Sequence, residues 1–267
     1  GKGEALFYRI LHPPDPGHGS FQGHSAGLGL SQRRIKPLTI LLFTMEKHNV
    51  KILDTFRVTH NVKGFRVERP DGYEFTPGQA TEVSINKPGW EEKERPFTFT
   101  SLPEEEHLEF TIKQYPSHQG VTRELHQLEK DQELILHEVF GAIQYQGEGL
   151  FIAGGAGVTP FISILRDLHR KKEVENNRLI FGNLTRKDII LEDELKEILG
   201  KDLISVLSGE NTEGYLKGLI TKDILETFRE DHHRYFYVCG PEPMMNMVLE
   251  GLSDLGVGED SIVREDL

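Results

Sequence analysis

The stretch FIAGGAGVTPF at residues 151–161 places three glycines between a short apolar run and a proline. The apolar run Leu150–Ala153 is typical of a buried strand, and the apolar residues from Phe161 to Leu168 recur at the spacing of one helix face. Proline is favoured at the first helical position because its missing N–H would have no partner there. Glycines let a ligand approach the backbone, and a helix start attracts anions. The stretch therefore predicts a nucleotide phosphate site at a strand-to-helix turn.

The hydrophobic pattern changes near residues 146–149, QGEG. Before this point, short alternating segments are separated by turn signals such as Asp71-Gly72 and Pro77-Gly78, which favours a small antiparallel β-barrel. After it, strands alternate with helical stretches, which favours an α/β domain with a Rossmann-like parallel sheet. We expect the barrel at residues 45–147 and the α/β domain at residues 148–267. The expected strands are 50–58, 62–68, 80–85, 97–101, 108–113 and 133–137, then 150–153, 178–181, 203–207 and 235–239.

Residues 1–44 differ from the rest of the chain in composition, with 7 of the 27 glycines, five basic residues and two acidic ones. We expect Met45 to be the natural start, and residues 1–44 to be a flexible extension or an added leader. The apolar segment PLTILLF at 37–43 follows basic residues, but it lies too far from the start for a signal peptide. His12, His18 and His24 are either metal ligands or solvated loop residues, and the second interpretation is favoured.

Charge and cysteine content limit the function classes. The net charge of −12 at pH 7 argues against broad electrostatic binding of nucleic acid or an anionic membrane. No apolar run approaches the roughly 20 residues of a membrane helix. The single cysteine, Cys239, excludes an internal disulfide and a four-thiolate iron–sulfur cluster, and no metal site is expected. We expect a cytoplasmic monomer.

Three further stretches carry candidate binding chemistry. YVCGPEPMM ends an expected strand at Cys239 and turns into a helix, so Cys239 lines either the ligand crevice or the core. In ERPFTFTSLP, Arg95 has the chemistry to bind a phosphate and Phe97 to pack on a flat ligand. Taken by itself, this stretch is better explained as an ordinary core strand that ends in a surface ion pair. In IKQYPSHQGVTRELHQL, Thr122 is expected to cap a helix near Lys113, which is another anion site.

These four stretches, in this order, resemble the ferredoxin–NADP reductase superfamily from about Lys51 to the C-terminus. RPFTFTS is similar to the family's flavin signature, GVT to its pyrophosphate turn, GGAGVTPF to its nicotinamide-dinucleotide turn, and CGPEPMM to its nicotinamide-side loop. The resemblance implies bound FAD, hydride transfer from NADH or NADPH, and release of electrons to an acceptor such as ferredoxin or flavodoxin.

The resemblance also implies roles for individual residues. Thr98, Cys239 and Glu265 would be catalytic. The flavin would be held by Arg95, Phe97, Thr98, Lys113, Tyr115, Gly120, Val121 and Thr122. The nicotinamide coenzyme would be held by Gly154, Gly155, Gly157, Thr159, Pro160, Gly240, Pro241 and Met244.

The chain departs from the family pattern in two places. Phe97 stands where the family has a tyrosine, so a hydroxyl contact to the flavin is lost, and Leu267 stands where many members have an aromatic terminus. A smaller terminal side chain would leave the nicotinamide pocket easier to enter.

The coenzyme and the acceptor stay open. No arginine occurs between Val206 and Gly218, which favours NADH slightly, although Arg186, Lys217 and Tyr215 remain candidates for a 2′-phosphate. Residues 45–267 carry a net charge of −15, which would repel an acidic redox protein unless Lys63, Arg66, Lys87 and Lys93 form a docking patch. Small acceptors such as free flavin or chelated iron avoid this repulsion. A non-catalytic nucleotide-binding regulatory subunit is the alternative class.

Overall fold

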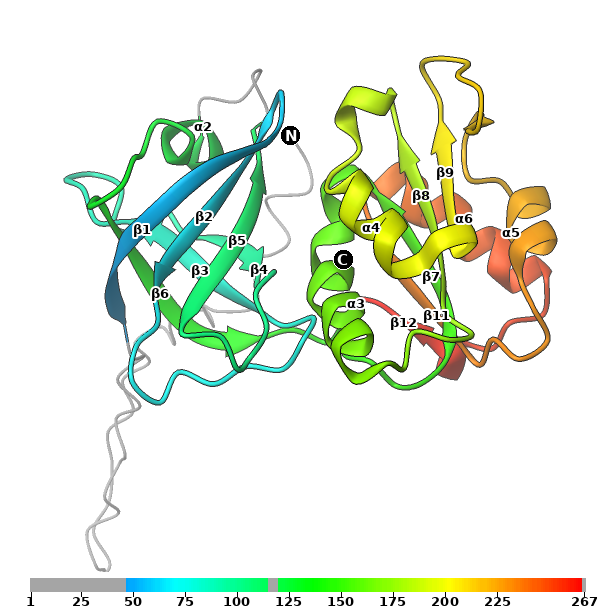
Figure 1. Cartoon of the computed structure of the whole chain (residues 1–267), viewed down its shortest axis with the longest axis horizontal. Coiled ribbons are helices and arrows are strands. Elements are labelled where there is room, and N and C mark those ends of the chain that lie inside the picture. Colours follow the sequence, from blue (N-terminus) through cyan, green and yellow to red (C-terminus); the bar gives the residue numbers. More distant parts are fainter. Residues whose placement is uncertain (1–46, 115–119, 266–267) are drawn as a thin grey trace, which may run out of the picture. The chain divides into compact units, whose positions relative to one another are not determined.

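A computed structural model describes residues 47–114 and 120–265 of the chain. The described residues form two six-stranded sheets, the first antiparallel and the second parallel (Figure 1). The strands of the first sheet are β1 (His48–Thr59), β2 (Val62–Glu68), β3 (Ala80–Ile85), β4 (Arg95–Thr98), β5 (His107–Lys113) and β6 (Glu133–Phe140), with the short helix α2 (Val121–Leu125) between β5 and β6.

The first sheet closes into a barrel. Its strand order is β4-β3-β6-β1-β2-β5, so β4 and β5 are the two edges. An antiparallel bridge between Phe99 and Phe110 joins these edges, and the Thr100 N–H donates to the Glu109 carbonyl at 2.8 Å. Alternation along the strands directs apolar side chains inward, where Phe65, Phe99 and Phe110 are fully buried. The antiparallel barrel is thereby confirmed.

The second sheet consists of β7 (Gly149–Gly154), β8 (Arg178–Asn183), β9 (Leu203–Leu207), β10 (Leu216–Lys217), β11 (Tyr235–Cys239) and β12 (Ile262–Val263). Its order is β10-β9-β8-β7-β11-β12, and all of its strand pairs are parallel. The main connections are the helices α3 (Thr159–Lys171), α4 (Glu192–Leu199), α5 (Lys222–Phe228) and α6 (Glu242–Asp254). The expected α/β fold with a Rossmann-like parallel sheet is confirmed.

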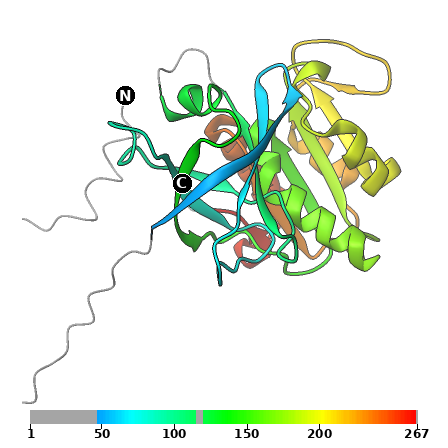
Figure 2. The same cartoon turned by 60° about the vertical axis from the view of Figure 1, so that its left-hand side comes forward.

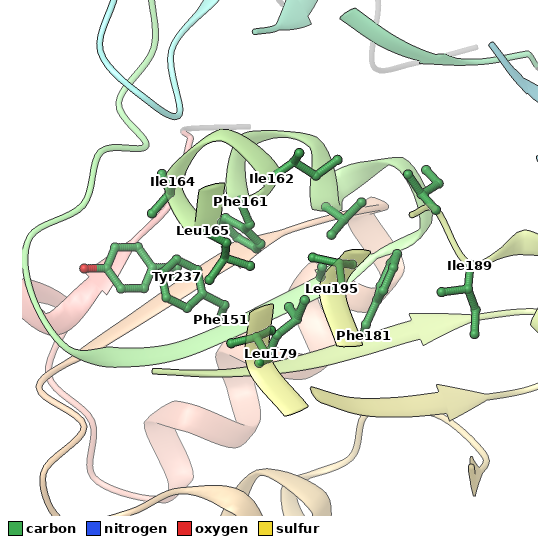
Figure 3. Close-up of a cluster of buried hydrophobic side chains, with 14 of the residues drawn as sticks. Phe151, Phe161, Ile162, Ile164, Leu165, Leu179, Phe181, Ile189, Leu195 and Tyr237 are labelled. Carbon is green, nitrogen blue, oxygen red and sulfur yellow. The ribbon is translucent and has the colours of Figure 1, made fainter. Parts of the chain in front are cut away.

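Helices cover both faces of the second sheet, with α3 and α4 on one side and α5 and α6 on the other (Figure 1, Figure 2). Successive side chains of β7 point to opposite faces of the sheet and so enter different cores. Phe151 packs with residues of α3 and α4, whereas Leu150 and Ile152 pack with residues of α5 and α6. Figure 3 shows the first of these cores, where Phe151 lies under Phe161 and Leu165 of α3.

Two details differ from the sequence-based expectations. The strand expected at 97–101 is β4, which spans Arg95–Thr98, because β3 begins at Ala80 opposite Thr98 and the next residue, Phe99, pairs with Phe110 of β5. Thr122 was expected to cap α2, but the N-cap is Gly120 and no side chain caps the helix. Thr122 instead lies in the first turn of α2. Within the described residues, no helix is both long and apolar enough to cross a membrane.

Tyr237 fixes the loop that leads into the second sheet. Its ring stacks on Phe151 at 4.2 Å, and its hydroxyl donates to the Gly147 carbonyl at 2.7 Å. The same oxygen accepts hydrogen bonds from the N–H groups of Gln146 and Gly147, at 2.8 and 3.0 Å. Burial raises the pKa of Tyr237 to about 12.

Tyr237→Phe should therefore destabilise the fold. The substitution keeps the ring stack but leaves three backbone groups without their partner, which is expected to cost about 1–3 kcal/mol. Chemical denaturation followed by circular dichroism measures the change. Tyr235→Phe, on the same strand but at a partly exposed position, is the matched control and should change stability by less. Equal losses in the two variants would contradict the role assigned to the Tyr237 hydroxyl.

Candidate functional site

The strand order of the parallel sheet creates a ligand crevice between β7 and β11. The chain runs outward from β7 through β8 and β9, then returns to place β11 on the other side of β7. At such a switch point the connections leave in opposite directions, and ligands bind beyond the carboxyl ends of the two strands. The turns at these two ends contain Gly155 and Gly240, so two of the motifs found in the sequence flank the same crevice.

The structure requires glycine at several positions of the turn after β7, for different reasons. A Cβ on Gly154 would lie 2.4 Å from the Met244 Sδ, and one on Gly157 would lie 2.3 Å from the Cys239 carbonyl oxygen. These two glycines therefore let the turns after β7 and β11 pack together. Gly155 has a φ of +53°, a left-handed conformation that favours glycine. The turn continues as a short 3-10 segment, Gly155–Val158, directly into α3.

The start of α3 follows the expected pattern. Pro160 is in the first turn of the helix, as the sequence predicts, and it is buried. The Thr159 hydroxyl donates to the Ala156 carbonyl at 3.0 Å, which ties the helix start to the glycine turn. The Thr159 N–H is already bonded to the Ala156 carbonyl, because the 3-10 segment runs directly into α3. The first N–H groups of a helical segment lack partners within it, so the anion-binding chemistry belongs to the glycine turn where the 3-10 segment begins.

A pocket opens beside the glycine turn. Its empty volume is about 620 Å³, part of it open to solvent. Lys113 of β5 also lines it, and the Lys113 Nζ would lie 3.5 Å from a Cβ on Gly155. A lysine ammonium and a helix start each attract an anion, so the two together make a stronger anion site. The lining residues are Lys113, Gly154, Gly155, Gly182, Asn183, Leu184, Ser208, Gly218, Leu219, Ile220, Pro241 and Met244.

Asn183 is a site residue that the sequence analysis missed. It ends β8 and lines the pocket, and it is 8% exposed. Within the described residues, neither its amide oxygen nor its amide nitrogen has a hydrogen-bond partner. A buried polar group without a partner is costly, so this amide fits a site completed by a polar ligand or by water. Its position at the end of the expected strand LIFGN is the sequence feature that could have identified Asn183 as a site residue.

Cys239 and Glu265, two of the three expected catalytic residues, interact electrostatically at the end of β11. Burial raises the pKa of the Cys239 thiol to about 12, and the negative charge of Glu265 contributes in the same direction. The Glu265 residue is exposed as a whole, but partial burial raises the pKa of its carboxyl. The thiol is therefore neutral at physiological pH and has no thiolate character. Cys239 is partly buried, consistent with a position between the core and the crevice.

The residues expected to hold the flavin lie on β4, at Lys113 of β5 and at the start of α2, and of these Lys113 lines the pocket beside Gly155 of the nicotinamide-dinucleotide turn. Arg95 is exposed, and its guanidinium donates to the Glu94 carbonyl at 2.7 Å. Phe97 and Thr98 are partly buried, and they pair with Thr81 and Ala80 of β3. The other residues of this group are Gly120, a position with open space beside it, buried Val121, and Thr122; Tyr115 lies outside the described residues, as does Leu267.

Two of the three candidates for 2′-phosphate binding, Arg186 and Tyr215, already make contacts within the protein. The Arg186 guanidinium donates to Glu192 at 3.3 Å and lies over the Tyr215 ring, and the Tyr215 hydroxyl donates to the same carboxylate. Lys217 is exposed on β10. Glu210, which the sequence analysis passed over, accepts a hydrogen bond from the Arg186 backbone N–H at 2.6 Å. A carboxylate therefore stands beside the loops that follow β8 and β9.

Comparison with known proteins finds relatives and a matching domain family for this chain. Residues 151–250 match the oxidoreductase NAD-binding domain family. The chain is 28% identical over 245 residues to the glycine betaine monooxygenase reductase subunit of Chromohalobacter salexigens, covering 85% of this chain and 66% of that protein. It is 31% identical over 210 residues to the propane 2-monooxygenase reductase component of Rhodococcus jostii, covering 72% of this chain and 55% of that protein. The chain thus spans between half and two thirds of these relatives.

Solved structures share the fold. The FAD/NAD-binding domain of nitric oxide dioxygenase from Vibrio cholerae superposes with a TM-score of 0.73 at 19% identity, covering 81% of this chain and 97% of that one. A ferredoxin NADP+ reductase from Neisseria gonorrhoeae superposes with a TM-score of 0.70 at 19% identity, covering 82% and 98%. Both halves of the described chain are therefore found together in these structures.

Proposed function

We propose that the chain is a member of the ferredoxin–NADP reductase superfamily, a FAD-dependent NAD(P)H oxidoreductase that passes electrons to a separate acceptor. The observation that carries the proposal is the convergence of the two glycine-containing turns on one crevice, with Lys113 of the barrel at the same pocket. The two domains are taken as residues 45–147 and 148–267. We also propose that the protein is a cytoplasmic monomer.

The described residues fit both cofactors. For the nicotinamide coenzyme, Gly155 provides an open left-handed turn, Lys113 provides charge, and Asn183 provides an amide without a partner. For FAD, Arg95 is exposed and the start of α2 has open space at Gly120. Arginine binds phosphates through its fork, and a helix start binds them through backbone N–H groups.

Bound FAD would supply the capacity to accept a hydride and to release electrons singly. The residues of the protein would hold the flavin and the nicotinamide in position. Phe97 would pack against the flavin ring, and the Thr98 hydroxyl would donate a hydrogen bond near its reactive nitrogen. Gly154, Gly157, Gly240, Pro241 and Met244 would shape the nicotinamide side of the crevice. The neutral Cys239 thiol and the Glu265 carboxyl would exclude water and orient the nicotinamide without forming a covalent bond.

The test of this function is anaerobic reduction of the purified protein. We expect the protein to be yellow and the flavin absorbance to bleach when NADH or NADPH is added. A colourless protein that takes up no added FAD would overturn the proposal and favour the nucleotide-binding regulatory subunit.

NADH is the coenzyme that the electrostatics favour. The Glu210 carboxylate would repel a 2′-phosphate and can accept a hydrogen bond from a ribose hydroxyl. The positive charge of Arg186 is already paired with the Glu192 carboxylate. Glu210→Gln should therefore shift the ratio of kcat/KM values about tenfold toward NADPH, since tenfold corresponds to about 1.4 kcal/mol. Glu213→Gln, which neutralises an exposed carboxylate in the same loop, is the control. An unchanged ratio in Glu210→Gln would remove this residue from coenzyme selection.

The acceptor is proposed to be a redox protein such as ferredoxin or flavodoxin, or a partner oxygenase component. Two relatives are named as reductase components of monooxygenases, which supports a protein acceptor. Free flavin and ferric chelates are the small-molecule alternative. Steady-state assays with each acceptor class, at low and high salt, separate them because docking of charged proteins is screened by salt.

A further inference from the structure

Arg166 links the α/β half of the chain to the barrel, and its guanidinium is bonded to two groups of the barrel and one of the α/β half. The residue lies on α3, and its guanidinium is paired with both carboxylate oxygens of Glu194 on α4, at 2.5 and 3.0 Å. Its remaining terminal nitrogen donates to the Thr100 carbonyl at 2.6 Å and to Glu109 of β5 at 2.9 Å. An arginine fork with this many partners has its orientation fixed.

The barrel side of this contact is a buried hydrogen-bond network. Glu109 is 4% exposed and accepts hydrogen bonds from Arg166, from Arg66 at 3.2 Å and from the Thr100 hydroxyl at 3.2 Å. The Thr100 hydroxyl also lies 3.3 Å from that of Thr111. Two arginines therefore face two carboxylates, those of Glu109 and Glu194. The network is charge-balanced and partly shielded from water, so its geometry is held tightly.

Both ends of the network lie close in sequence to the proposed cofactor-binding stretches. Thr100 follows Thr98, the last residue of β4, by two residues and belongs to the stretch that resembles the flavin signature. Arg166 lies about two helical turns beyond Thr159, on the helix that begins at the glycine turn. A second bond, from the Gly78 N–H to the Ser163 hydroxyl at 3.0 Å, joins the same helix to the barrel.

We infer that Arg166 is a positioning residue for hydride transfer: through Thr100 and α3 it sets the distance between the flavin strand and the nicotinamide turn. The inference rests on the proposed function. Reacting atoms must lie about 3–3.5 Å apart, and a misplacement of about 1 Å can cost on the order of 100-fold in rate. Loss of the Arg166 fork would therefore slow the chemical step more than it weakens coenzyme binding.

The experiment compares flavin reduction in Arg166→Met, Arg166→Lys and Arg170→Met by anaerobic stopped flow with NADH. Arg170 lies one turn further along α3, and its pair with Glu104 at 2.9 Å also reaches the barrel but is exposed, so it is the matched control. We expect the limiting reduction rate of Arg166→Met to fall about 10- to 100-fold, with less than about threefold change in the NADH dissociation constant. Arg166→Lys should recover part of the rate, and Arg170→Met should match the unaltered protein.

Two further readouts separate positioning from general damage. The deuterium isotope effect with 4-deuterated NADH should increase in Arg166→Met, because hydride transfer becomes slower relative to the other steps. In flavin-free protein, the backbone amides of Phe99 and Thr100 should exchange faster in Arg166→Met than in Arg170→Met. If Arg166→Met does not fold, the double variant Arg166→Met/Glu109→Gln, which leaves no unpaired Glu109 charge, replaces it.

The outcomes distinguish this inference from the proposed function. An Arg166→Met protein that is reduced at the normal rate, or whose rate loss is matched by an equal loss of NADH affinity, overturns the positioning role. Failure of the unaltered protein to bind FAD or to be reduced by NADH and NADPH instead overturns the proposed function.

Discussion

Gly157→Ala is expected to lower kcat/KM for NADH about 100-fold. The added Cβ would lie 2.3 Å from the Cys239 carbonyl oxygen, 2.5 Å from the Cys239 carbonyl carbon and 2.6 Å from the Gly240 Cα. These are backbone atoms, which cannot rotate away as a side chain can. The turns after β7 and β11 must therefore separate, and a shift of about 1 Å in the crevice costs on the order of 100-fold in rate.

Gly258→Ala is the control for this prediction, because a Cβ at Gly258 meets open space and the residue has a φ of −75°. Steady-state kinetics with NADH measure both variants, and circular dichroism checks that they fold. The packing explanation is wrong if Gly157→Ala keeps its full kcat/KM.

Arg166→Met is expected to destabilise the fold by about 3–5 kcal/mol at neutral pH, since it leaves the buried Glu109 carboxylate with one of its two arginines missing. Burial alone would raise the pKa of Glu109, but the hydrogen bonds and charges of Arg166 and Arg66 outweigh it and hold the pKa below its ordinary value. The pairing therefore contributes stability above the unfolded pKa of about 4.3, and this contribution is lost as pH falls through the lower folded pKa.

The pH dependence is the signature of this prediction. With Arg166 absent, burial should dominate and the Glu109 pKa should rise, so protonation relieves the unpaired charge. The difference in stability between the unaltered protein and Arg166→Met should therefore shrink between pH 7 and pH 4. Urea denaturation at these two pH values measures it. Arg170→Met, which breaks an exposed pair, should cost less than about 1 kcal/mol at both. A loss in Arg166→Met that does not depend on pH would exclude Glu109 as its cause.

The sequence was sufficient for the fold because its signals are local. The alternation from residue 50 to residue 113 and the strand-to-helix turn at Gly155 each depend on neighbouring residues, and both the barrel and the parallel sheet are confirmed. The sequence also located the ends of β7 and β11, and topology then brings those ends together. Which strand Phe99 joins depends on a partner, Phe110, from a later segment, and the expected end of β4 was wrong for that reason.

The polar contacts around the site could not be predicted from neighbouring residues in the sequence. Arg166 meets Glu109 across 57 residues of sequence and Glu194 across 28, and no spacing rule relates such positions. The capping role expected for Thr122 was wrong because Gly120, two residues earlier, occupies the N-cap position. Glu210 was missed because the sequence pattern considered in its loop concerns arginines, whereas the contact that the structure shows there is a carboxylate bonded to the Arg186 N–H. The roles of the individual cofactor residues stay predictions.

The two outermost strands of the parallel sheet, β10 and β12, are only two residues long each. An edge strand presents backbone donors and acceptors that can template pairing with another chain, and the hazard grows with the length of the exposed edge. The described barrel has its edges joined through Phe99 and Phe110. Within the described residues, strand addition from another chain therefore finds little exposed backbone to extend in either sheet.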